Sequence, residues 1–269
     1  MAFFLCSCAS EKELFNSYEI IVPNALKGIY VVTNMDTDQI IEENTFTVTG
    51  DTLNLKLEVS IDVENFKVTI KDADILDYYN NELLTFSSKQ TLDVLVDGNN
   101  EEHEEEIRYA MTPYTTLAAC FSDEPGFANE LFSEHLGFDF REIIPENSDS
   151  NSSLPEKLEY YMWVAGFSYM ARLHADLSTS LSSPILNTMT LIDILCVDAS
   201  DGIFDGLKNN TDLDHGAVPL NNQFLRSELV DALFYYLESG FNTTAYFGDI
   251  VPLIAGSVGN NTNPLMFDE

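Results

Sequence analysis

The chain has 269 residues, and its 45% hydrophobic content is enough for packed cores in one large or two ordinary domains and too high for a disordered chain. Its formal net charge of -33, with only 12 Lys and Arg, argues against nucleic acid as a partner and against direct adhesion to anionic lipid. Divalent cations and basic surfaces are the natural counterparts of such a chain, although surplus carboxylates also keep proteins soluble in salty surroundings without specific binding.

The start of the chain is a short apolar run that ends in Leu5-Cys6-Ser7-Cys8. A large apolar residue three positions before a cysteine and a small residue just before it are typical of bacterial lipoprotein signals. This pattern predicts lipid attachment at Cys8, with residues 1–17 as the signal end and tether. No Lys or Arg precedes Lys12, which favours a truncated start. The alternative is a buried first strand with two incidental cysteines.

Residues 18–110 carry short alternating or β-branched runs separated by turn residues. In the run from Thr52 to Val59, leucines at alternate positions face one side and polar residues face the other, as in a half-buried strand. The spacing of the runs predicts a small β-sandwich. The acidic run from Glu101 to Glu106 is interpreted as a solvated loop. The expected strands are 18–22, 28–33, 45–49, 52–59, 66–70, 83–86, 91–96 and 107–109.

The strand pattern stops at Thr112-Pro113, where Thr112 can cap a helix and proline can occupy its first position. Residues 111–269 are therefore expected to form an α-helical domain, with the apolar helix around Trp163 at its centre. The polar stretch from Glu146 to Ser153 is interpreted as a flexible excursion. The expected helices are 115–121, 127–136, 154–174, 187–197, 225–237 and 246–255.

Two cysteines remain after the predicted lipidation region, Cys120 and Cys196, and both lie in apolar helical contexts. The sequence is equally compatible with one disulfide and with two buried thiols.

Acidic residues and glycines cluster between Asp198 and Gly216. Calcium needs six to eight oxygen ligands that converge from a loop with tight turns, so this cluster is a candidate calcium site. Its spacing differs from that of an EF-hand. The alternative is a pair of Asp-Gly turns that cap a helix, with free carboxylates in water. The candidate ligands are Asp198, Asp201, Asp205, Asn210, Asp212 and Asp214.

Three stretches follow one another in a familiar order: Phe66–Asp77, the junction Thr112-Pro-Tyr-Thr-Thr-Leu-Ala118, and Leu191–Gly206. In these stretches the chain resembles bacterial cell-surface lipoproteins, in which an immunoglobulin-like or carboxypeptidase-regulatory-like β-domain precedes a helical domain. The resemblance implies an α+β protein, with an immunoglobulin-like β-sandwich followed by an all-α domain. It also implies a cell-envelope setting, but it supplies no catalytic residues.

No catalytic motif is recognisable, neither a nucleophile elbow nor a phosphate-binding loop nor a Cys-x-x-Cys pair. We therefore predict an acidic lipoprotein, lipid-anchored at the outer membrane or cell surface, that binds or scaffolds without catalysis. Calcium is its candidate cofactor, and an envelope protein or a glycan is its candidate partner. The alternative is a secreted hydrolase of polysaccharide or peptidoglycan that uses carboxylates of the helical domain. A role in storing a hydrophobic ligand would depend on the aromatic helix around Trp163.

Overall fold

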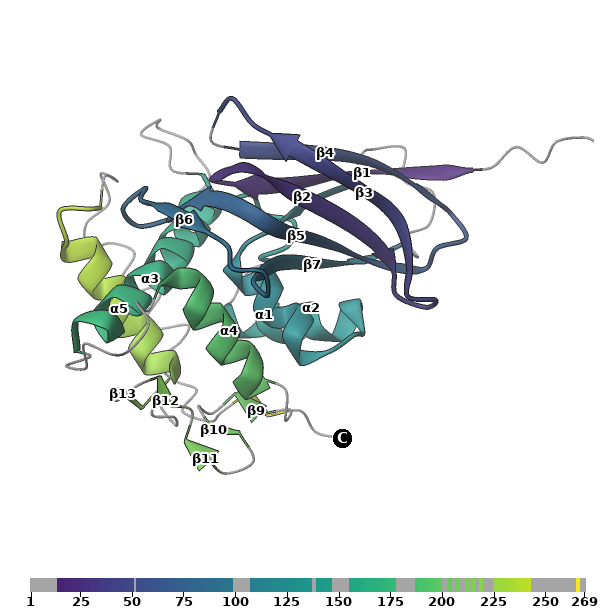
Figure 1. Ribbon diagram of the computed structural model, residues 1–269. Helices are drawn as coiled ribbons and strands as arrows, with labels where there is room; N and C mark the ends of the chain where they lie inside the picture. The colour runs from purple at the N-terminus through teal and green to yellow at the C-terminus, as the bar shows by residue number, and fades with distance from the viewer. Residues whose placement is uncertain are drawn as a thin grey trace, which may run out of the picture.

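The computed structural model describes residues 14–50, 52–98, 107–136, 139–146, 155–177, 187–199 and 225–242, together with six two-residue strands between 203 and 266. These residues form a mixed α+β fold in which two β-sheets lie on one side and five helices on the other (Figure 1). The expected α+β class is thus confirmed. In the described part of the chain, every helix is too short or too polar to cross a membrane.

The smaller sheet has three strands in the order β4-β1-β8, with β1 (Phe15–Pro23) between β4 (Thr52–Ser60) and β8 (Ile107–Ala110). β1 pairs with β4 antiparallel and with β8 parallel. The alternating leucines of β4 are buried and its polar residues are exposed, as the sequence predicts.

The larger sheet is antiparallel throughout. Its order is β3-β2-β5-β6, and β7 pairs with the other part of the same edge of β5. The chain forms it from β2 (Ala25–Asn34), β3 (Gln39–Thr47), β5 (Asn65–Leu76), β6 (Leu83–Thr85) and β7 (Thr91–Asp97).

The two sheets pack face to face. Tyr18 of β1 meets Phe66 of β5 edge to face, with 5.0 Å between ring centroids. Val68 and Ile70 alternate with Phe66 along β5, are fully buried and point to the same inner face. The finer expectation of an immunoglobulin-like sandwich stays a prediction.

Five helices follow the expected ones closely. Thr112 is the N-cap of α1, its backbone N–H donates to Thr115 Oγ1 at 2.9 Å, and Pro113 is the first helical residue. The helix around Trp163 is central, and Trp163 itself is fully buried. The bounds are α1 Pro113–Phe121, α2 Pro125–Leu136, α3 Pro155–Leu177, α4 Thr188–Ala199 and α5 Leu225–Glu238. The helix expected at 246–255 and the loops expected at 101–106 and 147–153 lie outside the described residues.

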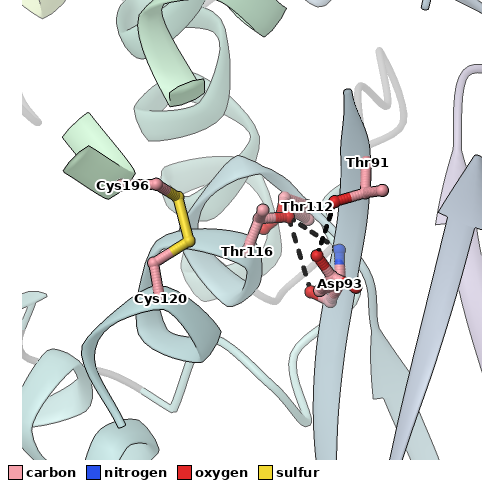
Figure 2. Close-up of a disulfide and its surroundings, with 6 residues drawn as sticks. All are labelled: Thr91, Asp93, Thr112, Thr116, Cys120 and Cys196. Carbon is pink, nitrogen blue, oxygen red and sulfur yellow. Dashed lines mark hydrogen bonds between the residues drawn. A yellow bond between two sulfur atoms is a disulfide. The ribbon is translucent and has the colours of Figure 1, made fainter. Parts of the chain in front are cut away.

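Helices α1 and α2 cover the free edge of β7. Thr116 Oγ1 accepts a hydrogen bond from the backbone N–H of Asp93 at 2.9 Å and lies 3.5 Å from the Asp93 carbonyl (Figure 2). Asn129 of α2 donates to the carbonyl of Leu95 at 3.5 Å. Because an edge strand exposes unpaired N–H and C=O groups, these side chains stand in for a neighbouring strand.

The hydrophobic core is continuous from the sheets into the helices, and its buried members run from Tyr18 in β1 to Leu237 in α5. Backbone bonds also link the halves: the Ala110 N–H donates to Arg141 and the Met111 N–H to Ile21. The expected boundary at residue 110 coincides with the change from strand to helix, whereas separate folding of 18–110 and 111–269 stays a prediction.

The expectation of an all-α second half is wrong in detail. Two-residue strands pair β9 (Ile203–Phe204) with β14 (Leu265–Met266), β10 (Leu207–Lys208) with β11 (Thr211–Asp212), and β12 (Asp214–His215) with β13 (Val218–Pro219). A two-residue strand is too short to show alternation, so the sequence pattern does not reveal it.

Replacing Thr116 by Val should lower the free energy of unfolding by about 1–3 kcal/mol, because the nearly isosteric side chain leaves the buried Asp93 N–H without its acceptor. Urea denaturation measures the change. The matched control is Thr47→Val, at an exposed position of β3, which should change stability by less than about 0.5 kcal/mol. Equal effects of the two substitutions would contradict the role assigned to the Thr116 hydroxyl.

Candidate functional site

The predicted calcium ligands are only partly described. Asp198 is fully buried in the last turn of α4, whereas a calcium ligand in a surface loop would be exposed to water. Asp212 and Asp214 lie in different strand pairs, Asp212 opposite Leu207 and Asp214 opposite Pro219. Asp201, Asp205, Asn210 and the predicted lipidation residue Cys8 lie outside the described residues. Among the side chains that are described, no group of three or more His, Cys, Asp or Glu could hold a metal ion.

Helix α4 is fixed to the β half by two carboxyl groups. At its first turn, the Thr188 hydroxyl donates to Asp77 Oδ1 at 2.9 Å, and Asp77 follows directly after β5. One and a half turns later, Gln90 Nε2 donates to Asp193 Oδ2 at 2.9 Å, and Gln90 directly precedes β7. The helix therefore lies across the ends of two strands of the larger sheet.

A disulfide between Cys120 and Cys196 makes the third attachment of α4 (Figure 2). It joins the end of α1 to α4 across a sequence separation of 76 residues, with 5.2 Å between the Cα atoms. The sequence left pairing open, and the structure resolves it in favour of the disulfide. A cross-link over so long a loop lowers the conformational entropy of the unfolded chain, which stabilises the fold by about 4.5 kcal/mol.

Burial changes the acidity of both carboxyl groups. Asp77 is 4% exposed, and its desolvation raises its pKa above the usual range, although the Thr188 hydrogen bond partly offsets this rise. Desolvation also raises the pKa of Asp193, opposed by the hydrogen bond from Gln90. Both groups are committed to hydrogen bonds that join elements, so their part in the site is to position it.

The surface beside Asp77 carries an aromatic cluster, defined here as Tyr79, Tyr169 and Phe241. Tyr79 meets Tyr169 edge to face at 5.5 Å between centroids and meets Phe241 edge to face at 5.3 Å. Phe241 is 49% exposed, and the two tyrosines are half-buried. The rings come from three segments, namely the turn after β5, helix α3 and the end of α5, so tertiary folding brings them together.

The turn that presents Tyr79 is held firmly on both sides. The Asp77 N–H donates a hydrogen bond to the Glu82 carbonyl at 2.8 Å, which joins the two ends of the turn. Asn81 lies in the left-handed region at φ 59°, and its backbone N–H donates to the Asp77 carbonyl. The neighbouring Tyr78 is buried and its carbonyl accepts from the Tyr161 hydroxyl at 3.3 Å. A fixed turn presents its exposed ring in one orientation, which lowers the entropy cost of binding.

The segment that presents Phe241 is also fixed. Ser239 Oγ accepts from the Phe241 N–H at 3.2 Å, and Asn242 donates to the Leu237 carbonyl at 3.0 Å, which closes the end of α5. α5 packs closely on α3, where a Cβ at Gly166 would come within 3.0 Å of the Leu233 backbone. Gly166 thereby lets the two helices bring Tyr169 and Phe241 to one surface.

Sequence reasoning missed this cluster, because its three members lie 72 or more residues apart and share no motif. A signal did exist for the two carboxyl groups. Asp77 lies between Leu76 and Tyr78, and Asp193 interrupts the apolar run Leu191–Leu195. An isolated acid in apolar surroundings indicates a buried, hydrogen-bonded group.

Comparison with known proteins gives no family assignment. No protein-family model matches the chain, and no curated protein or solved structure matches it either. The resemblance to envelope lipoproteins therefore stays a prediction.

Replacing Asp77 by Asn should remove a pH-dependent loss of stability. Because the folded-state pKa of Asp77 is raised, its contribution to stability is fully present below the unfolded value of 3.8 and is lost as pH rises through the folded-state pKa. The free energy of unfolding of Asp77→Asn minus that of the wild type should therefore increase with pH. Urea melts from pH 3.5 to 7 measure this difference, at about 1.4 kcal/mol per unit of pKa shift.

The matched control for this experiment is Asp62→Asn, at an exposed turn position. Its difference from the wild type should stay nearly constant over the same pH range. A constant difference for Asp77→Asn as well would show that its carboxyl group is not destabilised by burial.

Proposed function

We propose that the protein is a non-catalytic binding module of the cell envelope that recognises a neutral glycan through the aromatic cluster Tyr79, Tyr169 and Phe241. The observation that carries this proposal is the half-exposed cluster on fixed supports. Soluble proteins rarely expose contiguous apolar surface without a use for it. Aromatic rings offer large contact area at low entropy cost, and the apolar faces of sugar rings stack against them.

The charge of the chain supports a neutral ligand. With a net charge of -33, an acidic polysaccharide would be repelled over the whole surface. Polar residues adjoin the rings along the chain: Asn80 and Asn81 follow Tyr79 in the turn, and the exposed Arg172 lies one turn after Tyr169 on α3. Asn80 Oδ1 already accepts from the Glu82 N–H at 2.9 Å.

The disulfide supports a location outside the cytosol, since disulfides persist in oxidising compartments and are rare where thiols are kept reduced. This fits the predicted lipid anchor at Cys8 and an envelope position at the outer membrane or cell surface. In this proposal the two sheets act as an immunoglobulin-like support that holds the helical half away from the anchor.

The hydrolase alternative has less support. The two carboxyl groups with raised pKa, the buried Asp77 and the half-buried Asp193, already make hydrogen bonds that fix α4. Calcium dependence through the Asp198–Asp214 cluster stays a proposal, and the binding experiment below includes it as an arm.

Isothermal titration of the full chain with chitotetraose should give a Kd of about 0.1–1 mM, because only a few sugar rings stack on the aromatic side chains. Phe241→Ala should weaken binding about tenfold, because it removes the most exposed ring of the cluster. The matched control is Tyr235→Ala, which removes a 52% exposed ring outside the cluster and should leave the Kd unchanged.

The same titration with calcium and with chelator, on the wild type and on Asp201→Asn with Asp205→Asn, tests the calcium arm. Calcium dependence that the double variant abolishes would support the metal proposal. Absence of binding to chitotetraose and cellotetraose by the wild type, or equal losses in Phe241→Ala and Tyr235→Ala, would remove the glycan proposal.

The envelope proposal predicts that cells fed a fatty-acid analogue label the wild type at Cys8 and leave Cys8→Ala unlabelled. Fractionation should place the labelled protein with membranes and release the unlabelled variant. Labelling of Cys8→Ala at the wild-type level would contradict the predicted anchor.

A further inference from the structure

Strand β3 is an unusual member of the larger sheet, because both of its faces are largely exposed. Only Glu42 and Phe46 are half-buried in it, whereas Ile40 is 59% and Ile41 40% exposed. The sequence predicted a strand at 45–49 only, and the structure begins it at Gln39. The added residues contribute little to the core, so packing does not account for them.

The outer edge of β3 is open among the described strands, since β3 pairs only with β2. The Val48 N–H, just after β3, donates inward to the Leu26 carbonyl at 2.7 Å. Because N–H groups alternate in direction along a strand, those of Glu43, Thr45 and Thr47 point away from β2. The same sheet has its β7 edge closed by Thr116 and Asn129. Within the described ranges, the β7 edge is thus closed by side chains, whereas no strand lies beside the β3 edge.

The charge beside this edge selects the kind of strand that fits. Residues 34–50 contain four acids and no Lys or Arg: Asp36, Asp38, Glu42 and Glu43. Glu43 already pairs with the ammonium group of Lys71 at 2.9 Å, from β5 of the same sheet. A second copy of β3 would place like charges opposite each other, which destabilises a strand pair. A basic strand would instead meet opposite charges.

We propose that the β3 edge binds an extended, basic segment of a partner protein by strand addition. Backbone hydrogen bonds to Glu43, Thr45 and Thr47 supply the pairing, as in other β-augmentation sites. Lysine or arginine side chains of the partner lie beside Glu43 on one face of the strand, and the alternating apolar side chains lie on the other face. This surface is separate from the aromatic cluster, so the proposal does not depend on glycan binding.

The probe is an acetylated and amidated eight-residue peptide of alternating lysine and valine, titrated into the ¹⁵N-labelled full chain at 0.15 M salt. Binding should protect the amides of Glu43, Thr45 and Thr47 from exchange with water. Thr45→Pro removes an outward N–H without breaking the β2 ladder, and it should weaken binding at least tenfold. Phe241→Ala should bind the peptide as the wild type does.

Two further peptides separate strand pairing from general attraction to an acidic protein. A peptide of the same charge, N-methylated at alternate residues, cannot pair and should bind at least tenfold more weakly, a test that needs no variant of the protein. A glutamate and valine peptide should not bind. Equal binding of the methylated and unmethylated peptides, or binding of the glutamate peptide as tight as that of the lysine peptide, would overturn the proposal.

Discussion

The hydroxyl group of Thr116 takes the place of a neighbouring strand along β7, and the arrangement of the helices depends on this contact. It seats α1 against the sheet, which puts Tyr114 and Leu117 into the common core. In this position α1 places Cys120 where it forms the disulfide with Cys196 of α4. α4 is also attached directly to the ends of the strands, through Asp77 and Asp193. One edge contact thus orients two helices.

The buried carboxyl groups show how a strongly acidic chain distributes its charge. Most of its acids can stay in water, where they repel one another only weakly through screening. Asp77, which is buried, and Asp193, which is half-buried, lie where sheet and helix meet and where hydroxyl or amide donors reach them. Hydrogen bonding makes their burial tolerable, and it gives the contact between α4 and the sheet a directional component that apolar packing alone lacks.

The sequence predicted the described strands and helices well where the pattern is local. The leucines of β4 and the Thr112-Pro113 cap are each decided by a few neighbouring residues, so their periodicity and capping chemistry are readable in advance. β3 was underestimated because Gln39–Asn44 are exposed on both faces and show no alternation. The aromatic cluster could not be predicted, since it depends on how α3 and α5 pack around Gly166.

The parallel pairing of β1 with β8 has a consequence for the order in which the protein can fold. Tyr18 lies opposite Ile107, so one side of the central strand of the smaller sheet has no partner until the chain beyond residue 107 is available. Contacts between such distant positions form slowly, because a long loop must close before they stabilise anything. During synthesis, Ile20 and Val22, both fully buried in the folded protein, would lie beside an open strand edge. The nascent chain is therefore most prone to aggregate before β8 emerges.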